Sequence, residues 1–181
     1  MKSKAEKERK KPAPATKSRA PSRLELTRGV EETRLFIQLA GNYVHRLDMD
    51  RQRLYAGDLD MARVAGAVAL GSMEANLRLP EFRQKYRDLR TVIGVDAQRG
   101  TNAMSIAQYT GIPRETVRRK LKRLVEFGAV TEKTRGAYVI TPGFPQQPQS
   151  LTVIEAAMRY TLQFMNDCLS LGLVRLADSS D

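Results

Sequence analysis

Residues 101–143 constrain the fold of this chain more than any other stretch, because signals for local structure follow one another there at short spacing. Asn102 is suited to cap a short helix that should run to about Thr110, since its side chain can accept hydrogen bonds from the first free backbone N–H groups. The apolar side chains of Ile106 and Ala107 are expected to face inward. One short helix with a single apolar face is therefore predicted.

A second helix is predicted directly after a tight turn. Gly111 supplies the turn, and Pro113 suits the first turn of the new helix, where its missing N–H costs nothing. The helix should span residues 113–127 and end at Gly128, because glycine readily adopts the left-handed conformation that terminates helices. Its predicted buried stripe consists of Val117, Leu121, Leu124 and Val125.

The opposite side of this second helix is strongly basic. Its charged residues are Arg114, Glu115, Arg118, Arg119, Lys120, Lys122 and Arg123, and Glu126 lies near the end of the helix. Six basic residues against two acidic ones give the helix a net charge of +4, and the whole chain carries +11. Positive charge gathered on one helix favours a polyanionic partner such as DNA or RNA.

Two short strand-like runs follow, at residues 129–133 and 137–141. Residues 134–136 (Thr-Arg-Gly) should form the turn between them, and the Pro-Gly pair at 142–143 ends the unit. The apolar positions of the two runs are Val130, Tyr138 and Ile140. A short helix, a turn, a basic helix and a β-hairpin in this order are the layout of a winged helix-turn-helix.

The same segment resembles known bacterial transcription regulators. The spacing of five residues is similar to that of their helix-turn-helix motifs: Ala107, Gly111, Val117, Leu121 and Leu124. The hairpin at 129–141 resembles the wing of the MarR and Crp/Fnr classes, and the run Arg114-Glu115-Thr116-Val117 with Arg119 resembles a Crp-type recognition helix. Residues 102–143 carry the close part of this resemblance, while the link between the predicted first helix of the motif and Asn102 is longer than the family pattern.

The resemblance also implies roles for single residues. It implies three base-reading side chains in the major groove: Arg114, Glu115 and Arg119. It places three others nearer the DNA backbone: Thr116, Arg118 and Lys122. The chemistry agrees, because arginine can donate two hydrogen bonds to guanine and glutamate can accept one from cytosine. Lys133 and Arg135 on the wing either contact the DNA backbone or minor groove, or merely form an exposed polar tip.

Further helices are predicted before this segment. Apolar residues at helical spacing predict a helix within residues 24–47, and Asp58 could cap a second one that reaches about Leu77. Since the second helix is apolar on nearly all sides, it is expected to be central and buried. Pro80 interrupts the pattern, and residues 81–89 should form a short exposed helix.

A last helix is predicted from Ser150 to about Leu171. Its wide apolar face consists of Ile154, Ala157, Met158, Leu162, Met165 and Leu169, widened by Val153, Tyr160 and Phe164. Such a face needs a partner, which is either the chain's own helix at 30–47 or a second copy of the chain, as in MarR-like proteins. We expect a homodimer, because such proteins commonly present two recognition helices to half-sites about one DNA turn apart. A small-molecule effector between these helices is left open.

Residues 1–23 differ in composition from the rest. They hold nine basic and two acidic residues, three prolines and almost no large apolar side chain. Because little apolar surface is available to offset the entropy of ordering, a disordered basic arm is predicted. The arm either tethers the protein to nucleic-acid phosphates or serves only as a solubilising tail.

Single copies of the most reactive residue types limit the chemistry. Cys168 is the only cysteine and His45 the only histidine, so a Cys-rich or His-based metal site and a Ser-His or Cys-His pair are not expected. Without paired carboxylates or a phosphate-binding glycine-rich loop, we expect no enzyme, no metal and no cofactor. The longest apolar run, 64–70, is far shorter than a membrane span, so a cytoplasmic protein is expected, nucleoid-associated when it binds DNA.

These expectations combine into a mainly α fold with a small β-hairpin wing, that is, a winged helix-turn-helix with flanking N- and C-terminal helices. A basic arm (1–23) precedes an N-terminal dimerisation helix (24–57), a DNA-binding domain (58–143) and a C-terminal dimerisation helix (144–181). The predicted function is sequence-specific binding of double-stranded DNA in transcription regulation, with residues 113–127 in the major groove. The alternative is a winged-helix module that binds RNA or docks a protein without a specific DNA site.

Overall fold

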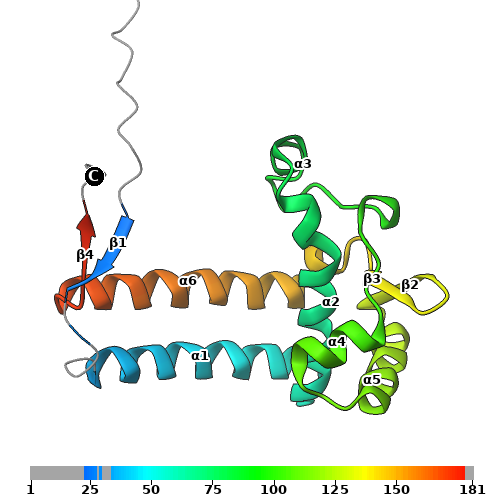
Figure 1. Ribbon diagram of the computed structural model, residues 1–181, viewed down its shortest axis with the longest axis horizontal. Helices are drawn as coiled ribbons and strands as arrows, with labels where there is room; N and C mark the ends of the chain where they lie inside the picture. The colour runs from blue at the N-terminus through cyan, green and yellow to red at the C-terminus, as the bar shows by residue number, and fades with distance from the viewer. Residues whose placement is uncertain (1–22, 28, 30–33, 178–181) are drawn as a thin grey trace, which may run out of the picture.

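The computed structural model describes residues 23–27, 29 and 34–177 of the chain, and these form an arm and a body (Figure 1). The arm consists of two long helices that lie side by side, α1 (Arg34–Leu54) and α6 (Pro148–Ser170). The body holds the elements between them, from α2 (Leu59–Leu77) to the hairpin. With six α-helices and this small antiparallel hairpin among the described residues, the predicted mainly α class is confirmed.

Helix α2 runs through the body and begins where the sequence predicts. The Asp58 side chain accepts a hydrogen bond from the Met61 N–H at 2.9 Å and so caps the helix. Val64 and Val68 are fully buried in the first half, while the second half is more exposed than expected. The core around α2 is built from Ile106, Val117, Leu121, Leu124 and Val130 of the neighbouring elements.

Helices α4 (Ala103–Thr110) and α5 (Arg114–Glu126) follow the predicted boundaries closely. The Asn102 side chain accepts hydrogen bonds from the N–H groups of Met104 and Ser105, both at 3.0 Å. Gly111 ends α4 with φ of +71° and Gly128 follows α5 with φ of +80°, a region that L side chains rarely adopt. The predicted tight turn at Gly111 and the predicted helix stop at Gly128 are therefore confirmed.

The hairpin consists of β2 (Val130–Thr134) and β3 (Ala137–Ile140), which pair antiparallel with a register shift between Glu132 and Thr134. Thr101 pairs with Tyr138 beside it through two backbone hydrogen bonds of 2.9 and 2.7 Å. This approach requires Gly100, because a Cβ there would lie 2.8 Å from the Cβ of Ala137. The start of α4 is thereby attached to the hairpin.

The long link between α2 and α4 contains α3 (Pro80–Lys85) and a 3-10 turn, η2 (Val95–Ala97). Helix α3 ends at Lys85 rather than at residue 89 as predicted. The end of the link is fixed by Gln98, a buried residue whose side-chain amide exchanges hydrogen bonds of 2.9 and 3.1 Å with the backbone of Ile140. The link is thus part of the body.

In the arm, α6 packs against α1, so the contact of the last helix with the chain's own N-terminal helix, which the sequence left open as the alternative to a dimer, is present. A second 3-10 turn, η3 (Phe144–Gln146), precedes α6. The Tyr43 ring stacks on Phe164 with centroids 5.2 Å apart, and its hydroxyl lies 3.0 Å from that of Thr161. No residue of α1 is buried, however, and α6 buries only Ser150, Ala156 and Cys168.

The far end of the arm carries a second small sheet that the sequence did not reveal. Strand β1 (Arg23–Leu26) pairs antiparallel with β4 (Val174–Ala177), at the left of Figure 1. The prediction of a helix from residue 24 is therefore wrong, and the helix begins at Arg34. Arg23 belongs to this sheet and not to the disordered basic segment that was predicted for residues 1–23. The other residues of that segment, 1–22, lie outside the described residues.

Candidate nucleic-acid interface

One exposed face of α5 carries five of the six residues that were predicted to contact DNA from this helix. They are Arg114, Glu115, Arg118, Arg119 and Lys122. An ion pair of 3.4 Å joins Arg118 and Glu115, whose side chains are 57% and 79% exposed. Because such exposed pairs contribute little energy, both side chains can turn toward a ligand. Thr116 is half-buried at the edge of this face.

The core holds the orientation of this face. Val117, Leu121 and Leu124 have no exposed surface, and they recur at the three- and four-residue spacing of one helix side. A rotation of α5 about its axis would bring these side chains into water and the arginines into the core. Val125 was predicted to belong to the buried stripe, which is wrong, since it is 41% exposed.

Two of the basic residues of α5 do not belong to its exposed face. Lys120 and Arg123 both bind Asp58, the residue that caps α2, with Nζ to Oδ2 at 2.5 Å and Nη1 to Oδ2 at 3.0 Å. The Lys120 side chain is only 12% exposed. Its predicted place on the side opposite the core is therefore wrong, because it lies three residues after Val117 and four before Leu124.

The hairpin lies beside α5 and presents one of its two predicted contact residues. Arg135 is exposed in the turn, where the N–H of the next residue, Gly136, donates to Glu132. Lys133 instead points back to the body and donates to the backbone oxygens of Gln98 at 2.9 Å and Asp96 at 3.3 Å.

The pKa of Tyr138 on β3 is affected by charged residues of the hairpin and of α5. Partial burial raises the pKa of its phenol, the carboxylate of Glu132 raises it further, and the guanidinium of Arg118 lowers it. The charge of Arg118 on α5 therefore acts on a side chain of the hairpin.

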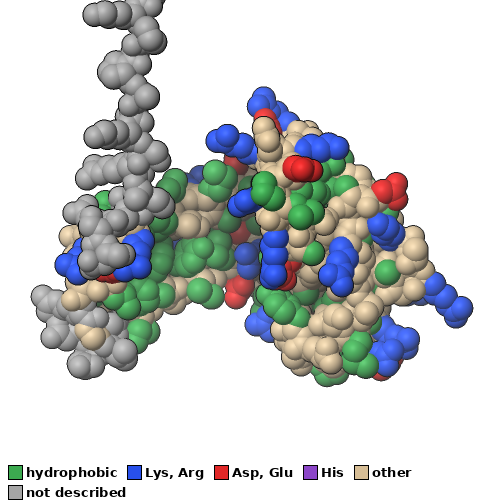
Figure 2. All heavy atoms as spheres, turned by 45° about the horizontal axis from the view of Figure 1, so that its top comes forward, with side chains coloured by type: hydrophobic (Ala, Val, Ile, Leu, Met, Phe, Trp, Pro, Cys, Tyr) green, Lys and Arg blue, Asp and Glu red, His purple; other side chains and the backbone are tan. Residues whose placement is uncertain are grey.

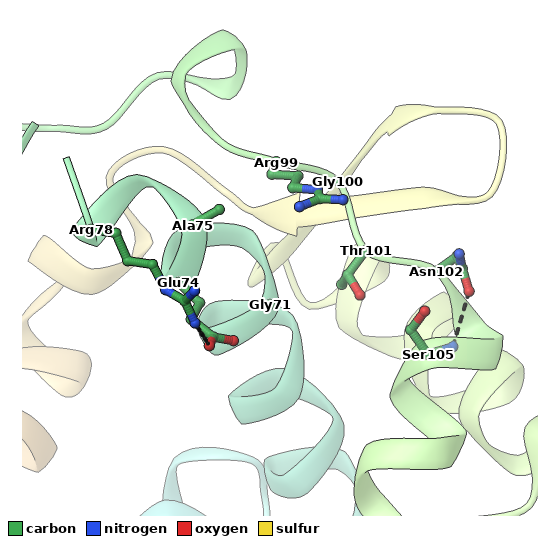
Figure 3. A pocket seen from close by; sticks show the side chains of 9 residues that line it. All are labelled: Gly71, Glu74, Ala75, Arg78, Arg99, Gly100, Thr101, Asn102 and Ser105. Atoms are coloured by element: carbon green, nitrogen blue, oxygen red, sulfur yellow. Dashed lines mark hydrogen bonds and ion pairs between the residues drawn. The ribbon is translucent and has the colours of Figure 1, made fainter.

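A cavity of about 440 Å³ opens between the second half of α2 and the start of α4 (Figure 3). Arg99 lies over it from the link, and Arg78, the residue directly after α2, lines it and pairs with Glu74 at 3.0 Å. Asn102 and Ser105 line the side of α4. Sequence analysis missed both arginines, because only the folded link brings residues 78 and 99 together.

The types of exposed side chain differ between the two parts of the molecule. Figure 2 shows hydrophobic side chains along the arm and Lys and Arg side chains distributed over the body. The exposed hydrophobic residues of the arm include Ile37 and Val44 of α1 and Met158 and Leu162 of α6. The body therefore presents positive charge to a ligand, whereas the arm presents apolar surface.

Among the described residues, no group of three or more His, Cys, Asp or Glu side chains could hold a metal ion. His45 is exposed on α1, and Cys168 is buried in α6, where burial and the neighbouring Asp167 raise the pKa of its thiol. In the same residues, none of the helices has the length and apolar character to cross a membrane.

No protein-family model matches this sequence, and no curated protein or solved structure matches it either. We therefore infer the function from the surfaces of α5, the hairpin and the arm.

Proposed function

We propose that this chain is a transcription regulator that binds a specific site on double-stranded DNA through a winged helix-turn-helix. Helix α5 is its recognition helix and the β2–β3 hairpin its wing. The observation that carries the proposal is the exposed face of α5, which is basic, flanked by the hairpin and held in one orientation by three fully buried side chains. A rigid helix with exposed polar side chains suits the major groove, which admits one α-helix.

Within this proposal, Arg114, Glu115 and Arg119 read bases. Arginine can donate a bidentate pair to O6 and N7 of guanine, and glutamate can accept from N4 of cytosine. The weak Arg118–Glu115 pair opens when Glu115 turns to a base.

The phosphates are contacted by residues at the border of this face. They are Thr116, Arg118 and Lys122 of α5 and Arg135 of the wing. Lys133 contributes only after its two hydrogen bonds to the link are broken, so we assign it the smallest part.

The protein acts as a homodimer in this proposal, held by its arms. Met158, Leu162, Met165 and Leu169 of α6 recur at spacings of four, three and four residues, and all four are exposed in the single chain. This is the spacing of coiled-coil interfaces. The wide apolar face of α6 therefore divides in two, with Tyr160 and Phe164 beside α1 and the four-residue stripe facing outward.

A second copy is the occupant that this surface fits. A two-helix arm in which α1 buries no residue has too little core of its own, and two such arms can pair into a four-helix bundle. An isologous contact uses the same stripe twice, so one chain supplies both sides. Two bodies would then offer two α5 helices to half-sites about one DNA turn apart. This assignment corresponds to a bacterial cytoplasmic protein that associates with the nucleoid.

Selection of binding duplexes from a random DNA library at near-physiological salt tests the proposal. Two inverted half-sites are the expected result, and they would supply the operator for later experiments. A single half-site would retain DNA recognition and contradict the dimer. Recovery of no motif by folded protein would refute sequence-specific binding and favour an RNA-binding or protein-docking module.

A further inference from the structure

The two carboxylate oxygens of Asp58 accept hydrogen bonds from two different helices. Oδ1 accepts the N–H of Met61 and caps α2, while Oδ2 accepts hydrogen bonds from Lys120 and Arg123 of α5. Two cations one turn apart on α5 thus converge on one oxygen at the start of α2. An N-cap alone requires one acceptor, which Asn or Ser supplies equally well.

Two of the three side chains in this contact are largely sheltered from solvent. The side chains of Asp58 and Lys120 are 17% and 12% exposed, whereas Arg123 is 54% exposed. Burial alone raises the pKa of Asp58, but the hydrogen bonds from Lys120 and Met61 and the charges of Lys120 and Arg123 outweigh burial and bring the pKa below its ordinary value. Asp58 is therefore ionised at neutral pH and bound to α5. Because the contact is partly sheltered from solvent, it should contribute more energy than the exposed ion pairs of the body.

The same corner also joins α5 to the arm. The Asp58 N–H donates to the backbone oxygen of Tyr55, which lies in the turn after α1. The Tyr55 ring lies 5.8 Å from that of Phe127, which ends α5, and 6.5 Å from that of Phe144, which precedes α6. Helix α5 is thus held near its middle by Asp58 and at its end by aromatic residues next to both arm helices.

We propose that Asp58 is a positioning residue for DNA recognition, which fixes the orientation of α5 relative to the arm by binding Lys120 and Arg123. This inference rests on the proposed function. It assigns Lys120 and Arg123 to the frame of the recognition helix rather than to phosphate contacts. In the dimer, Asp58 then determines the orientation of each α5 helix relative to its half-site.

The variant Asp58→Asn tests the proposal because a loss of helix orientation and a loss of negative charge should change the affinity for the selected duplex in opposite directions. Asparagine retains a good cap for α2 and removes the negative charge that binds Lys120 and Arg123. Charge alone would tighten binding to every duplex, since an acidic group is lost and two cations are released. Loss of orientation weakens binding to the selected duplex, by about tenfold if roughly one bidentate base contact is lost. We therefore expect the ratio of affinities for the selected and a scrambled duplex to fall about tenfold or more.

Asp88→Asn is the matched control. It makes the same chemical change and breaks an ion pair of 2.5 Å with Arg90, but both residues lie in the link between α2 and α4, away from α5 and from the cavity. Its affinity ratio should equal that of the wild type. Lys120→Met, which retains the apolar stem, should lower the ratio as Asp58→Asn does, even though it shifts the net charge the other way.

An unchanged ratio in Asp58→Asn, or in Lys120→Met if the first variant does not fold by circular dichroism, would overturn the positioning role. Asp58 would then be no more than the cap of α2. A wild-type protein without preference for any duplex would instead refute the proposed function, so the two failures are distinguishable.

Discussion

Shortening one side chain of the α6 stripe should weaken the dimer by an amount that follows from its exposure. A leucine that passes from water into an apolar interface gains about 1.5–3 kcal/mol. Leu162 is 59% exposed in the single chain, so its burial in an interface contributes about 1–2 kcal/mol per copy and about 2–4 kcal/mol per dimer. Leu162→Ala removes most of this gain, which raises the dissociation constant of the dimer about 30- to 700-fold.

Sedimentation equilibrium over a series of protein concentrations measures this constant directly. Leu77→Ala is the control, because Leu77 is 50% exposed at the end of α2 and does not belong to the arm. Its dissociation constant should match that of the wild type. A wild-type protein that stays monomeric, or equal constants for Leu162→Ala and the wild type, would refute the assignment of this stripe to the dimer.

Three further predictions concern DNA binding and stability. Arg119→Ala should cost about 1–3 kcal/mol on the selected duplex and relax its sequence preference, whereas equal weakening on all duplexes, measured by titration, would mean that Arg119 contacts only the backbone. Removal of residues 1–22 should weaken binding uniformly and flatten its dependence on salt; an unchanged slope would leave these residues no part in DNA binding. Burial raises the pKa of Tyr55 to about 12, above its ordinary value of 10.0. The Tyr55 phenol then loses its proton in the unfolded chain before it does so in the folded one as the pH rises from 10 to 12, so the free energy of unfolding should fall by about 2 kcal/mol over this range through Tyr55 alone. Urea titrations of Tyr55→Phe should lack this component, and an equal loss in both proteins would contradict it.

The part of the fold that could be predicted from sequence is the part specified by neighbouring residues. Asn102, Gly111 and Gly128 act within three or four residues of their own position, as a cap and two left-handed stops. The pairing of β1 with β4 joins residues about 150 positions apart, and no local pattern in either strand indicates the other. Residues 24–26 were therefore predicted to be helical, whereas they belong to strand β1.

The candidate site shows the same division. The exposure of Arg118 and Arg119 follows from helical periodicity, and the structure agrees. Periodicity also assigned Lys120 wrongly, although its spacing from Val117 and Leu124 was a usable signal that it faces α2. Its partner Asp58 lies 62 residues away and could be found only from the fold.

If the proposed function holds, the distribution of charge on α5 links DNA recognition to dimerisation. Asp58 draws Lys120 and Arg123 toward α2, so the exposed face retains four basic side chains and Glu115. Because affinity for any duplex grows with the number of phosphates that are neutralised, we expect one α5 face with four cations to bind DNA weakly. A second body on the same dimer makes its contact as an intramolecular step, which raises affinity only where two half-sites have the right separation. A recognition helix of modest charge thus favours a dimer that selects its site by the spacing of half-sites as well as by their bases.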